Sequence, residues 1–431
     1  MTDTVRSRFV KVLNGQNPED RLPVIEWATW WDLTIDRWRT EGLLEDLDKD
    51  GIKRWFGLDV DYQCWIPSIA EGAPRFARRL GRAEADPSPG SLRSPTSPQR
   101  GEVRQLGGYS NPSPGSLRSP TSPSRGEEQQ GEHRSNPSPG SLRSPTSPSR
   151  GEVCLGPTEE VVPHPEGEPW IEDEADYEAL LPFLYPDPVP FDREVWRAQA
   201  REHAAGEAIA WITLDGFFWF PRTLFGIEPH FYAFFDQPRL VHRINEDLAA
   251  YHLKCIEQFC EVCTPDFMTF AEDMSYNHGP MLSKEMFDEF LAPYYRLVIP
   301  ELERRGIVPL IDSDGDVEPM IPWLEGVGIR GILPLERMAG VDVARIRANH
   351  PEWIMIGGFD KTVMHLGEAT VRAEFKRLMP VLRQGRFVPS VDHQTPPEVS
   401  MEEYREYVAM LREVAAEAVQ ESEASRAIRQ S

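Results

Sequence analysis

Acidic residues, in one case next to a histidine, follow three apolar runs of this sequence. The three clusters are Glu272-Asp273 after residues 267–270, Asp312-Ser313-Asp314 after residues 307–311, and Asp392-His393 after residues 387–391. Carboxylates packed together raise one another's pKa and attract cations, and a histidine beside them can carry protons near neutral pH. Such a set of side chains could serve general acid and base catalysis, or could hold a hard metal ion.

Each candidate residue is given a role by its chemical type and its place after an apolar run. The expected catalytic residues are His393, Asp312, Asp314 and Asp273. The expected substrate-binding residues are Arg222, Tyr276, Trp219 and Glu272, with Arg222 and Tyr276 orienting an anionic group. If a metal is bound, the expected ligands are Asp312, Asp314 and Asp392. The alternative for any single carboxylate is a helix cap at the surface, because Asp favours that position.

The elements that must position these residues are short apolar strands that alternate with helices. Eight strands are predicted, at residues 24–27, 60–65, 208–214, 267–270, 307–311, 331–333, 354–356 and 387–391. Strands that alternate with helices indicate right-handed βαβ units and a parallel sheet, and eight such units favour a closed barrel. The fold class is therefore predicted as α/β, a single (β/α)₈ barrel, with the site at the carboxyl ends of the strands.

Capping signals fix several of the helices between these strands. A helix is predicted over residues 283–305, with Ser283 as N-cap, Gly306 as the stop, and bends or breaks at Pro293 and Pro300. A second helix is predicted over 400–423, where Ser400 and Glu403 have the spacing of a capping box. A third is predicted over 240–261, which favours buried structural cysteines over an iron–sulfur cluster for Cys255, Cys260 and Cys263.

A repeat interrupts the sequence early. The string PSPGSLRSPTSP occurs three times at a spacing of 25 residues, and each copy offers one leucine for burial. Such a composition cannot offset the chain entropy lost on folding, so we expect a disordered insert. The predicted organisation is residues 1–84 as the first part of the barrel, 85–153 as the insert, and 154–431 as the rest of the barrel.

The composition and net charge of the chain argue against several classes of function. Hydrophobic residues make up 40% of the chain and the net charge is -24, which favours a globular protein and argues against nucleic acid as a partner. No apolar run is long enough for a membrane span or a signal peptide, so we expect a cytoplasmic protein without a membrane partner. The cysteines are odd in number, five in all, which does not fit a disulfide framework.

Several phrases of the sequence resemble the uroporphyrinogen decarboxylase superfamily, including its methylcobamide:thiol methyltransferase-like branch. They are RSRFVKVLNGQNPEDRLPV, FFDQPRLVHRINEDL, EDMSYNHGPMLSKEMFDEFLAPYY, DSDGD, GIRGILPLE and FVPSVDHQTPPEVSMEEYREYV. The resemblance implies a (β/α)₈ barrel and, as the first expectation, a decarboxylase (a lyase) of the porphyrin biosynthesis type. It would need no cofactor and would act on a tetrapyrrole-like or other anionic small molecule. Barrels of this type commonly pair, so a homodimer is expected.

The resemblance leaves two alternatives open. One is a corrinoid-linked methyltransferase with an altered, oxygen-rich metal site, because Asp312-x-Asp314-Gly315 stands where that branch has His-x-Cys-Gly. Oxygen ligands at this place favour a divalent metal such as Mg²⁺ or Mn²⁺ over zinc. The other alternative is a barrel that binds a tetrapyrrole or corrinoid without turning it over. Bound metal, or binding without product, would separate these alternatives from decarboxylation.

Overall fold

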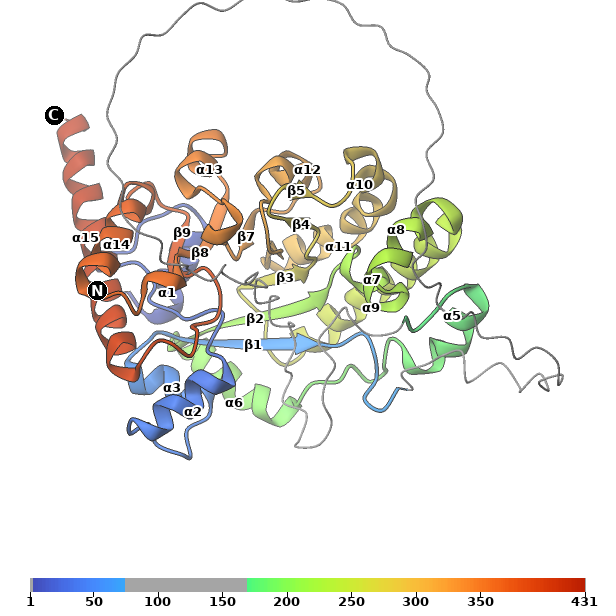
Figure 1. The fold of residues 1–431 in the computed structure, drawn as a ribbon, viewed down its shortest axis with the longest axis horizontal. Coiled ribbons are helices and arrows are strands. Elements are labelled where there is room, and N and C mark those ends of the chain that lie inside the picture. The colour runs from blue at the N-terminus through green and yellow to red at the C-terminus, as the bar shows by residue number, and fades with distance from the viewer. Residues whose placement is uncertain (1–2, 74–168, 431) are drawn as a thin grey trace, which may run out of the picture. The chain divides into compact units, whose positions relative to one another are not determined.

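The central element of the fold is a curled sheet of seven parallel strands (Figure 1). The computed structural model describes residues 3–73 and 169–430, which belong to one compact unit. The strands are β1 (Val60–Ile66), β2 (Ala208–Asp215), β3 (Phe267–Ala271), β6 (Val308–Asp312), β7 (Gly331–Leu333), β8 (Ile354–Phe359) and β9 (Phe387–Val391). They pair in the order in which they occur along the chain, so each strand returns beside the previous one. The predicted insert at 85–153 lies outside the described residues.

Seven of the eight predicted strands are confirmed, and the strand predicted at residues 24–27 is wrong. That segment makes isolated contacts instead of a ladder: the Asp59 amide donates to the Val24 carbonyl at 2.8 Å, and the Ser390 hydroxyl donates to the Ile25 carbonyl at 3.0 Å. Pro23 has no N–H to give to a neighbouring strand, and Thr29 has a left-handed φ of 58°. The segment therefore lies against β1 and β9 without becoming a strand, and the structure shows the curled sheet of an α/β protein.

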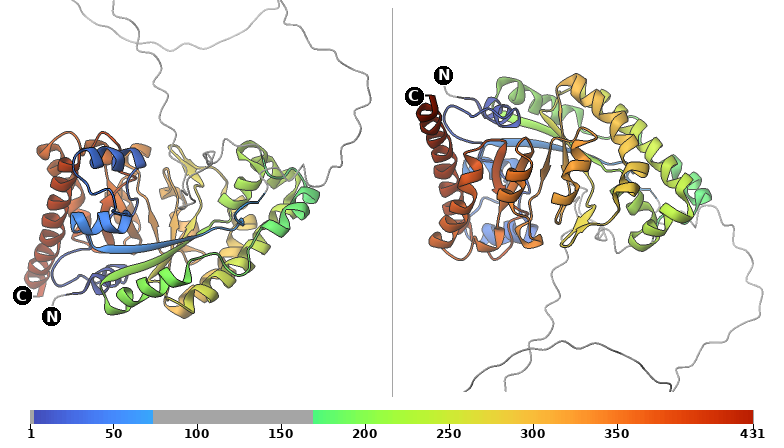
Figure 2. Two further views of the ribbon diagram at one scale, coloured as in Figure 1. Left: turned by 90° about the horizontal axis from the view of Figure 1, so that it is seen from below. Right: turned by 90° about the horizontal axis from the view of Figure 1, so that it is seen from above.

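Helices pack on the outside of the curl. In Figure 2, α15 lies at one side of the sheet while α9 and α11 run along the other. The helices are α1 (Val5–Leu13), α2 (Asp32–Thr40), α3 (Lys49–Phe56), α5 (Glu174–Leu180), α6 (Arg193–Ala205), α7 (Trp219–Phe225), α8 (Ile227–Asp236), α9 (Pro238–Cys260), α10 (Lys284–Phe290), α11 (Ala292–Arg305), α12 (Ile321–Glu325), α13 (Val343–Asn349), α14 (Glu368–Leu382) and α15 (Met401–Gln430). A small hairpin, β4 (Ser275–Tyr276) and β5 (Gly279–Pro280), follows β3.

The helix caps agree with the sequence. The Ser283 side chain accepts from the Met286 amide, and Gly306 ends α11 with a left-handed φ of 75°. The predicted helix 283–305 breaks at Leu291, just before Pro293, while Pro300 stays inside α11. The predicted helix over 240–261 is confirmed as α9. None of the helices in the described ranges is long and apolar enough to cross a membrane.

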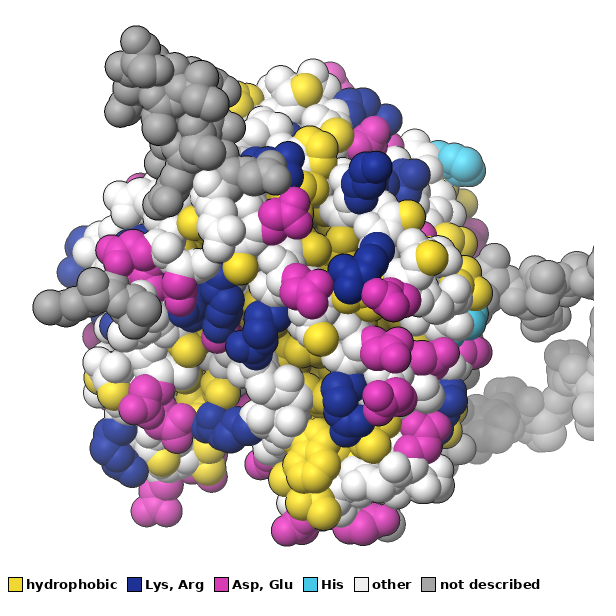
Figure 3. All heavy atoms as spheres, turned by 90° about the vertical axis from the view of Figure 1, so that its left-hand side faces the viewer, with side chains coloured by type: hydrophobic (Ala, Val, Ile, Leu, Met, Phe, Trp, Pro, Cys, Tyr) yellow, Lys and Arg dark blue, Asp and Glu magenta, His cyan; other side chains and the backbone are white. Residues whose placement is uncertain are grey.

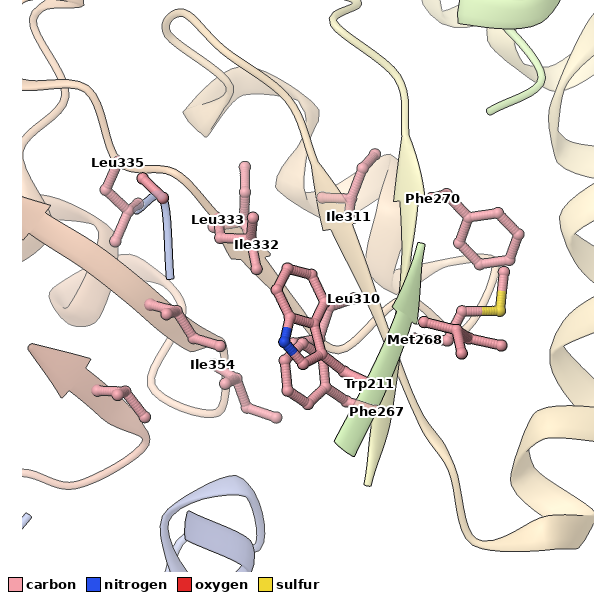
Figure 4. Close-up of a cluster of buried hydrophobic side chains, with 14 of the residues drawn as sticks. Trp211, Phe267, Met268, Phe270, Leu310, Ile311, Ile332, Leu333, Leu335 and Ile354 are labelled. Atoms are coloured by element: carbon pink, nitrogen blue, oxygen red, sulfur yellow. The ribbon is translucent and has the colours of Figure 1, made fainter. Parts of the chain in front are cut away.

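The core fills both sides of the sheet (Figure 4). Trp211 of β2 stacks on Phe267 of β3 with ring centroids 5.0 Å apart, and Phe9 of α1 stacks on Phe267 at 5.5 Å. Helix α1 thus closes the amino-terminal end of the sheet with an aromatic side chain. Phe270 points to the opposite side of the sheet. Fully burying an aromatic side chain contributes about 1.5 to 3 kcal/mol, so this layer is a large part of the stabilisation.

Charged side chains of both signs are mixed on the face of the molecule in Figure 3. Acidic and basic groups alternate there with apolar ones, and neither sign covers that face. The net charge of -24 is therefore not concentrated on the visible face.

Candidate active site

Asp314, Glu336 and His393 come together beyond the carboxyl ends of three strands. Asp314 follows β6, Glu336 follows β7 and His393 follows β9. One side-chain atom from each, a carboxylate oxygen or an imidazole nitrogen, lies within 4.8 Å of the corresponding atoms of the other two. Parallel strands end at the same edge of the sheet, which brings together side chains that lie far apart in the sequence. We call these three residues the acid cluster.

Glu336 is a partly buried member of the acid cluster with a strongly perturbed pKa. Burial raises the pKa of its carboxyl to about 8, and the charge of Asp314 acts in the same direction. Lys361 and the amide of Gly315, which donates to Glu336 Oε2 at 3.2 Å, act in the opposite direction. At neutral pH the Glu336 carboxyl is therefore mostly protonated, so it can act as an acid.

His393 has its tautomer fixed by the backbone. Its ring is 7% exposed, and Nδ1 accepts a hydrogen bond from the Gln394 amide at 2.9 Å. A backbone amide can only donate, so Nδ1 carries no proton, and the neutral ring holds its proton on Nε2. The edge of the Trp27 ring meets the imidazole at right angles, with centroids 6.4 Å apart. The histidine is thus placed to donate a hydrogen bond through Nε2.

Asp273 connects the acid cluster to Arg222. Asp273 Oδ1 accepts from the Asp314 amide at 3.1 Å, and its carbonyl accepts from Arg222 Nη1 at 3.0 Å. The Arg222 guanidinium also lies over the Trp219 ring, 4.4 Å from its centroid. Asp273 has a left-handed φ of 40°, a costly conformation for a residue other than glycine. Its contacts indicate that it positions the Asp314 backbone.

Glu272 is a buried anchor of the loop after β2. Its carboxylate accepts from the amides of Phe217 and Phe218 at 2.7 Å each, and from the Tyr295 hydroxyl. A side chain at Gly216 would strike this carboxylate, because an added Cβ would lie 2.1 Å from Glu272 Cδ. Burial raises the pKa of Glu272 to about 7, although the hydrogen bonds that its carboxylate accepts lower the pKa. These partners indicate a loop-binding role, whereas the sequence suggested contact with substrate.

The structure places Asp312, Asp392 and Tyr276 outside the acid cluster. Asp312 ends β6 and is 2% exposed. The Asp392 carboxylate accepts from the Arg337 amide at 3.0 Å and from the Lys361 amide at 3.1 Å, so it caps two short 3₁₀ helices, Arg337–Ala339 and Lys361–Val363. Tyr276 lies on the β4–β5 hairpin and is 49% exposed.

A divalent metal fits this site only in part. Of the three ligands predicted from the sequence, Asp314 alone belongs to the acid cluster, and Asp392 gives both oxygens to backbone amides. The two carboxylates of the cluster suit a hard cation. A metal on His393 Nε2 would move the ring proton to Nδ1, where it would meet the Gln394 amide. The histidine as hydrogen-bonded here therefore suits hydrogen-bond donation from Nε2 better than metal ligation.

Two residues of the site were missed from the sequence. Glu336 stands three residues after the strand at 331–333, and Lys361 stands two residues after β8. Both residues follow strand ends, so the rule that selected the other candidates also covers these two. Glu336 also belongs to the phrase GIRGILPLE, which carried the resemblance.

Comparisons with known proteins agree with the resemblance found in the sequence. The family model described as uroporphyrinogen decarboxylase (URO-D) matches residues 226–414, a range that holds the whole acid cluster. Among curated proteins, none matches the chain in sequence. A solved structure described as a methyltransferase from Methanosarcina mazei is similar, with a TM-score of 0.52 and 12% identity over 95% of this chain and 98% of that one. At this identity the likeness shows the fold alone.

Proposed function

Because the chain carries a URO-D family domain over residues 226–414, we propose that it is a carboxy-lyase-type enzyme of this family in which Glu336 donates the proton. The substrate in this proposal is a tetrapyrrole-like or other anionic small molecule. The observation that carries the proposal is the position of Glu336, which has side-chain atoms of Asp314 and His393 within 4.8 Å beyond the carboxyl ends of the strands. We also propose that residues 22–30 close the curled sheet into a (β/α)₈ barrel, since they contact both β1 and β9.

The chemistry of decarboxylation explains why such an acid would be needed. Loss of CO₂ leaves the electron pair of the broken bond on carbon, and a nearby acid must protonate that carbon. A carboxyl group with a pKa of about 8 still holds its proton at neutral pH and can give it up. The charge of Lys361, which already lowers the pKa of Glu336, would stabilise the carboxylate that forms.

Positive charge for an anionic substrate would come from Lys361 and Arg222. Arg222 is 6% exposed and fixed by the Asp273 carbonyl and the Trp219 ring, so little side-chain entropy would be lost on binding. A protonated Glu336 does not repel an anion, and its His393 neighbour can donate from Nε2. The site therefore offers an anionic substrate hydrogen-bond donors and two cationic side chains.

Replacing Glu336 tests the proposal. Glu336→Gln keeps the size of the side chain but removes the exchangeable acid, so CO₂ release from a panel of tetrapyrrole carboxylates should fall by roughly a hundredfold or more. The melting temperature should stay close to that of the parent. Glu45→Gln, at a side chain that is 83% exposed, is the matched control and should keep the parental rate. An unchanged rate in Glu336→Gln would reject Glu336 as the proton donor.

The parent protein and the Glu336→Gln variant also distinguish decarboxylation from the two alternative functions. Corrinoid-linked methyl transfer is favoured by the two carboxylates of the acid cluster, which together suit a hard cation. Elemental analysis of the purified parent should then find about one divalent metal per chain, and Glu336→Gln should lose it. Tight porphyrin binding without CO₂ release in the parent would instead favour a barrel that binds its ligand without turnover.

A further inference from the structure

A second group of reactive side chains lies at the amino-terminal end of the sheet, opposite the acid cluster. Cys260 is the last residue of α9, and Cys263 follows in the turn that leads to β3. His203 of α6 and Asp266, which stands just before β3, complete the group. In the described part of the chain no disulfide is formed, and Cys260 and Cys263 are both thiols.

Cys263, His203 and Asp266 are linked by hydrogen bonds in the order of a thiol, a base and a carboxylate. Asp266 Oδ2 lies 3.0 Å from His203 Nε2, and His203 Nδ1 lies 3.6 Å from Cys263 Sγ. A carboxylate at Nε2 holds the ring proton on that nitrogen, so Nδ1 is the acceptor that faces the thiol. Arg6 Nε donates to the other oxygen of Asp266 at 2.8 Å. The imidazole can therefore take the proton of Cys263.

Cys260 supplies the second thiol within one helical turn. The Cys263 amide donates to the Phe259 carbonyl at 3.0 Å, so the backbone keeps a helical turn past the end of α9. Residues three apart in a helix have Cβ atoms about 5 to 6 Å apart, and a disulfide needs roughly 4 Å. A small tightening of this last turn would join the two sulfurs.

The two thiols differ in exposure and in their neighbours. Cys260 is half-buried, whereas Cys263 is 4% exposed. Burial raises the pKa of the Cys260 thiol, and the charge and hydrogen bond of Arg305 oppose that effect. Burial raises the pKa of Cys263 to about 12, so this thiol needs a base before it can attack. Cys260 is therefore the thiol that a reagent from solution can reach.

We propose that Cys260 and Cys263 form a redox-active dithiol that a small-molecule disulfide oxidises to an intramolecular disulfide. The Cys260 thiolate attacks one sulfur of the reagent, its S–S bond breaks, and one thiolate leaves and takes a proton. His203 then accepts the proton of Cys263, whose sulfur attacks Cys260 and expels the second half of the reagent, which takes that proton. Two protein thiols are oxidised and one disulfide is reduced to two thiols. The site is independent of the proposed decarboxylase activity.

Oxidised glutathione is the probe for this site. The full-length chain, carrying Cys154→Ser so that only the described thiols are followed, is treated without denaturant, alkylated and mapped by mass spectrometry. We expect a disulfide between Cys260 and Cys263, while Cys255 stays a thiol. Cys255 is the internal control because burial also raises its pKa to about 12, but its neighbour is the Tyr251 hydroxyl, which is not a base.

Three variants test which residues act in the formation of the mixed disulfide and which act in its conversion to the intramolecular disulfide. Cys263→Ser should stop at the mixed disulfide of Cys260 with glutathione. His203→Gln should slow the conversion of the mixed disulfide by roughly a hundredfold. Cys255→Ser should change neither step.

Arg305→Gln should slow the first step, the attack of Cys260 on the reagent. This variant tests the proposal even if His203→Gln fails to fold. A parent chain that stops at the mixed disulfide, or an Arg305→Gln variant that reacts at the parental rate, would overturn the proposal.

Discussion

Four carboxyl groups, three of them buried and one partly buried, have raised pKa values chiefly because of burial, yet their neighbours give them different roles. Glu272 and Asp392 are surrounded by backbone amides, and they hold loops in place. Glu26 accepts from the hydroxyls of Ser390 and Tyr404 between the sheet and α15. Glu336 has another carboxylate and a lysine beside it, and it accepts from one backbone amide, that of Gly315, at 3.2 Å. Among these four groups Glu336 alone belongs to the acid cluster, which is why we propose it as the acid.

Glu26 should make the stability of the protein fall as pH rises. Its pKa is about 8 in the folded chain and near the ordinary 4.5 in the unfolded chain. Between these values the folded state binds more protons, so the free energy of unfolding falls by up to about 1.4 kcal/mol per pH unit. Below pH 4.5 and above pH 8 this group adds no slope.

Glu26→Gln removes the titrating proton and keeps the side-chain shape. The variant should therefore gain melting temperature relative to the parent at pH 8, and should gain little at pH 5. Thermal unfolding at both pH values measures the difference, with the exposed Glu45→Gln as control. Equal shifts at the two pH values would show that Glu26 does not titrate between them.

At the scale of elements, the capping signals and apolar runs of the sequence predicted the helices and strands well. Ser283, Gly306 and Ser400 end or begin helices as expected, because a cap depends on hydrogen bonds within a few residues. The strand expected at residues 24–27 failed because strand formation depends on distant partners. There Pro23 and Thr29 prevent a ladder.

The cap of α15 should contribute measurably to stability. The Glu403 amide donates to Ser400 Oγ at 3.2 Å, and the Ser400 amide donates to Glu403 Oε2 at 2.7 Å. Ser400→Ala breaks the first of these bonds, so it should cost about 1 kcal/mol of unfolding free energy.

Urea denaturation measures the cost. Thr40→Ala is the comparison, because the Thr40 hydroxyl donates to the Arg37 carbonyl at the end of α2 and caps no helix start. A loss in Ser400→Ala no larger than that in Thr40→Ala would mean that packing alone fixes the start of α15.

At the scale of the whole molecule, the two described stretches are joined by contacts of their own. Strand β1 pairs with β2 along its full length, and the Tyr185 amide donates to the Ser68 carbonyl at 2.8 Å. The Ala70 amide donates to the Phe183 carbonyl at the same distance. None of these bonds involves residues 85–153.

Deleting residues 85–153 should leave the fold intact. The strand pairing and hydrogen bonds just described join residues outside the deleted segment, and closing a shorter connection costs less chain entropy. The melting temperature should be equal to that of the parent or slightly higher, as measured by calorimetry. A protein that no longer unfolds cooperatively would show that the insert contributes to folding.

The candidate site was predicted in its location and only partly in its members. The rule that function lies after strand ends selected Asp314 and His393, which the structure brings together in the acid cluster. The rule could not show that Glu336 belongs to the acid cluster and Asp312 does not, because membership depends on how each loop turns after its strand. Nor could the sequence show that Glu272 and Asp392 are enclosed by amides, since those partners come from other loops.

The single carboxylate of Asp392 ties three loops of the candidate site together. It holds the amides of Arg337 and Lys361, so the loops after β7, β8 and β9 share one tether and must open together. A second tie joins the β4–β5 hairpin to the loop after β6, because the Ser275 hydroxyl donates to the Asp316 carbonyl at 2.6 Å and the Asp316 amide donates to the Tyr276 carbonyl at 3.1 Å. Amide hydrogen exchange would then be slow and concerted within each of these two groups of loops. In the proposed reaction, a substrate would meet Glu336 on a fixed wall.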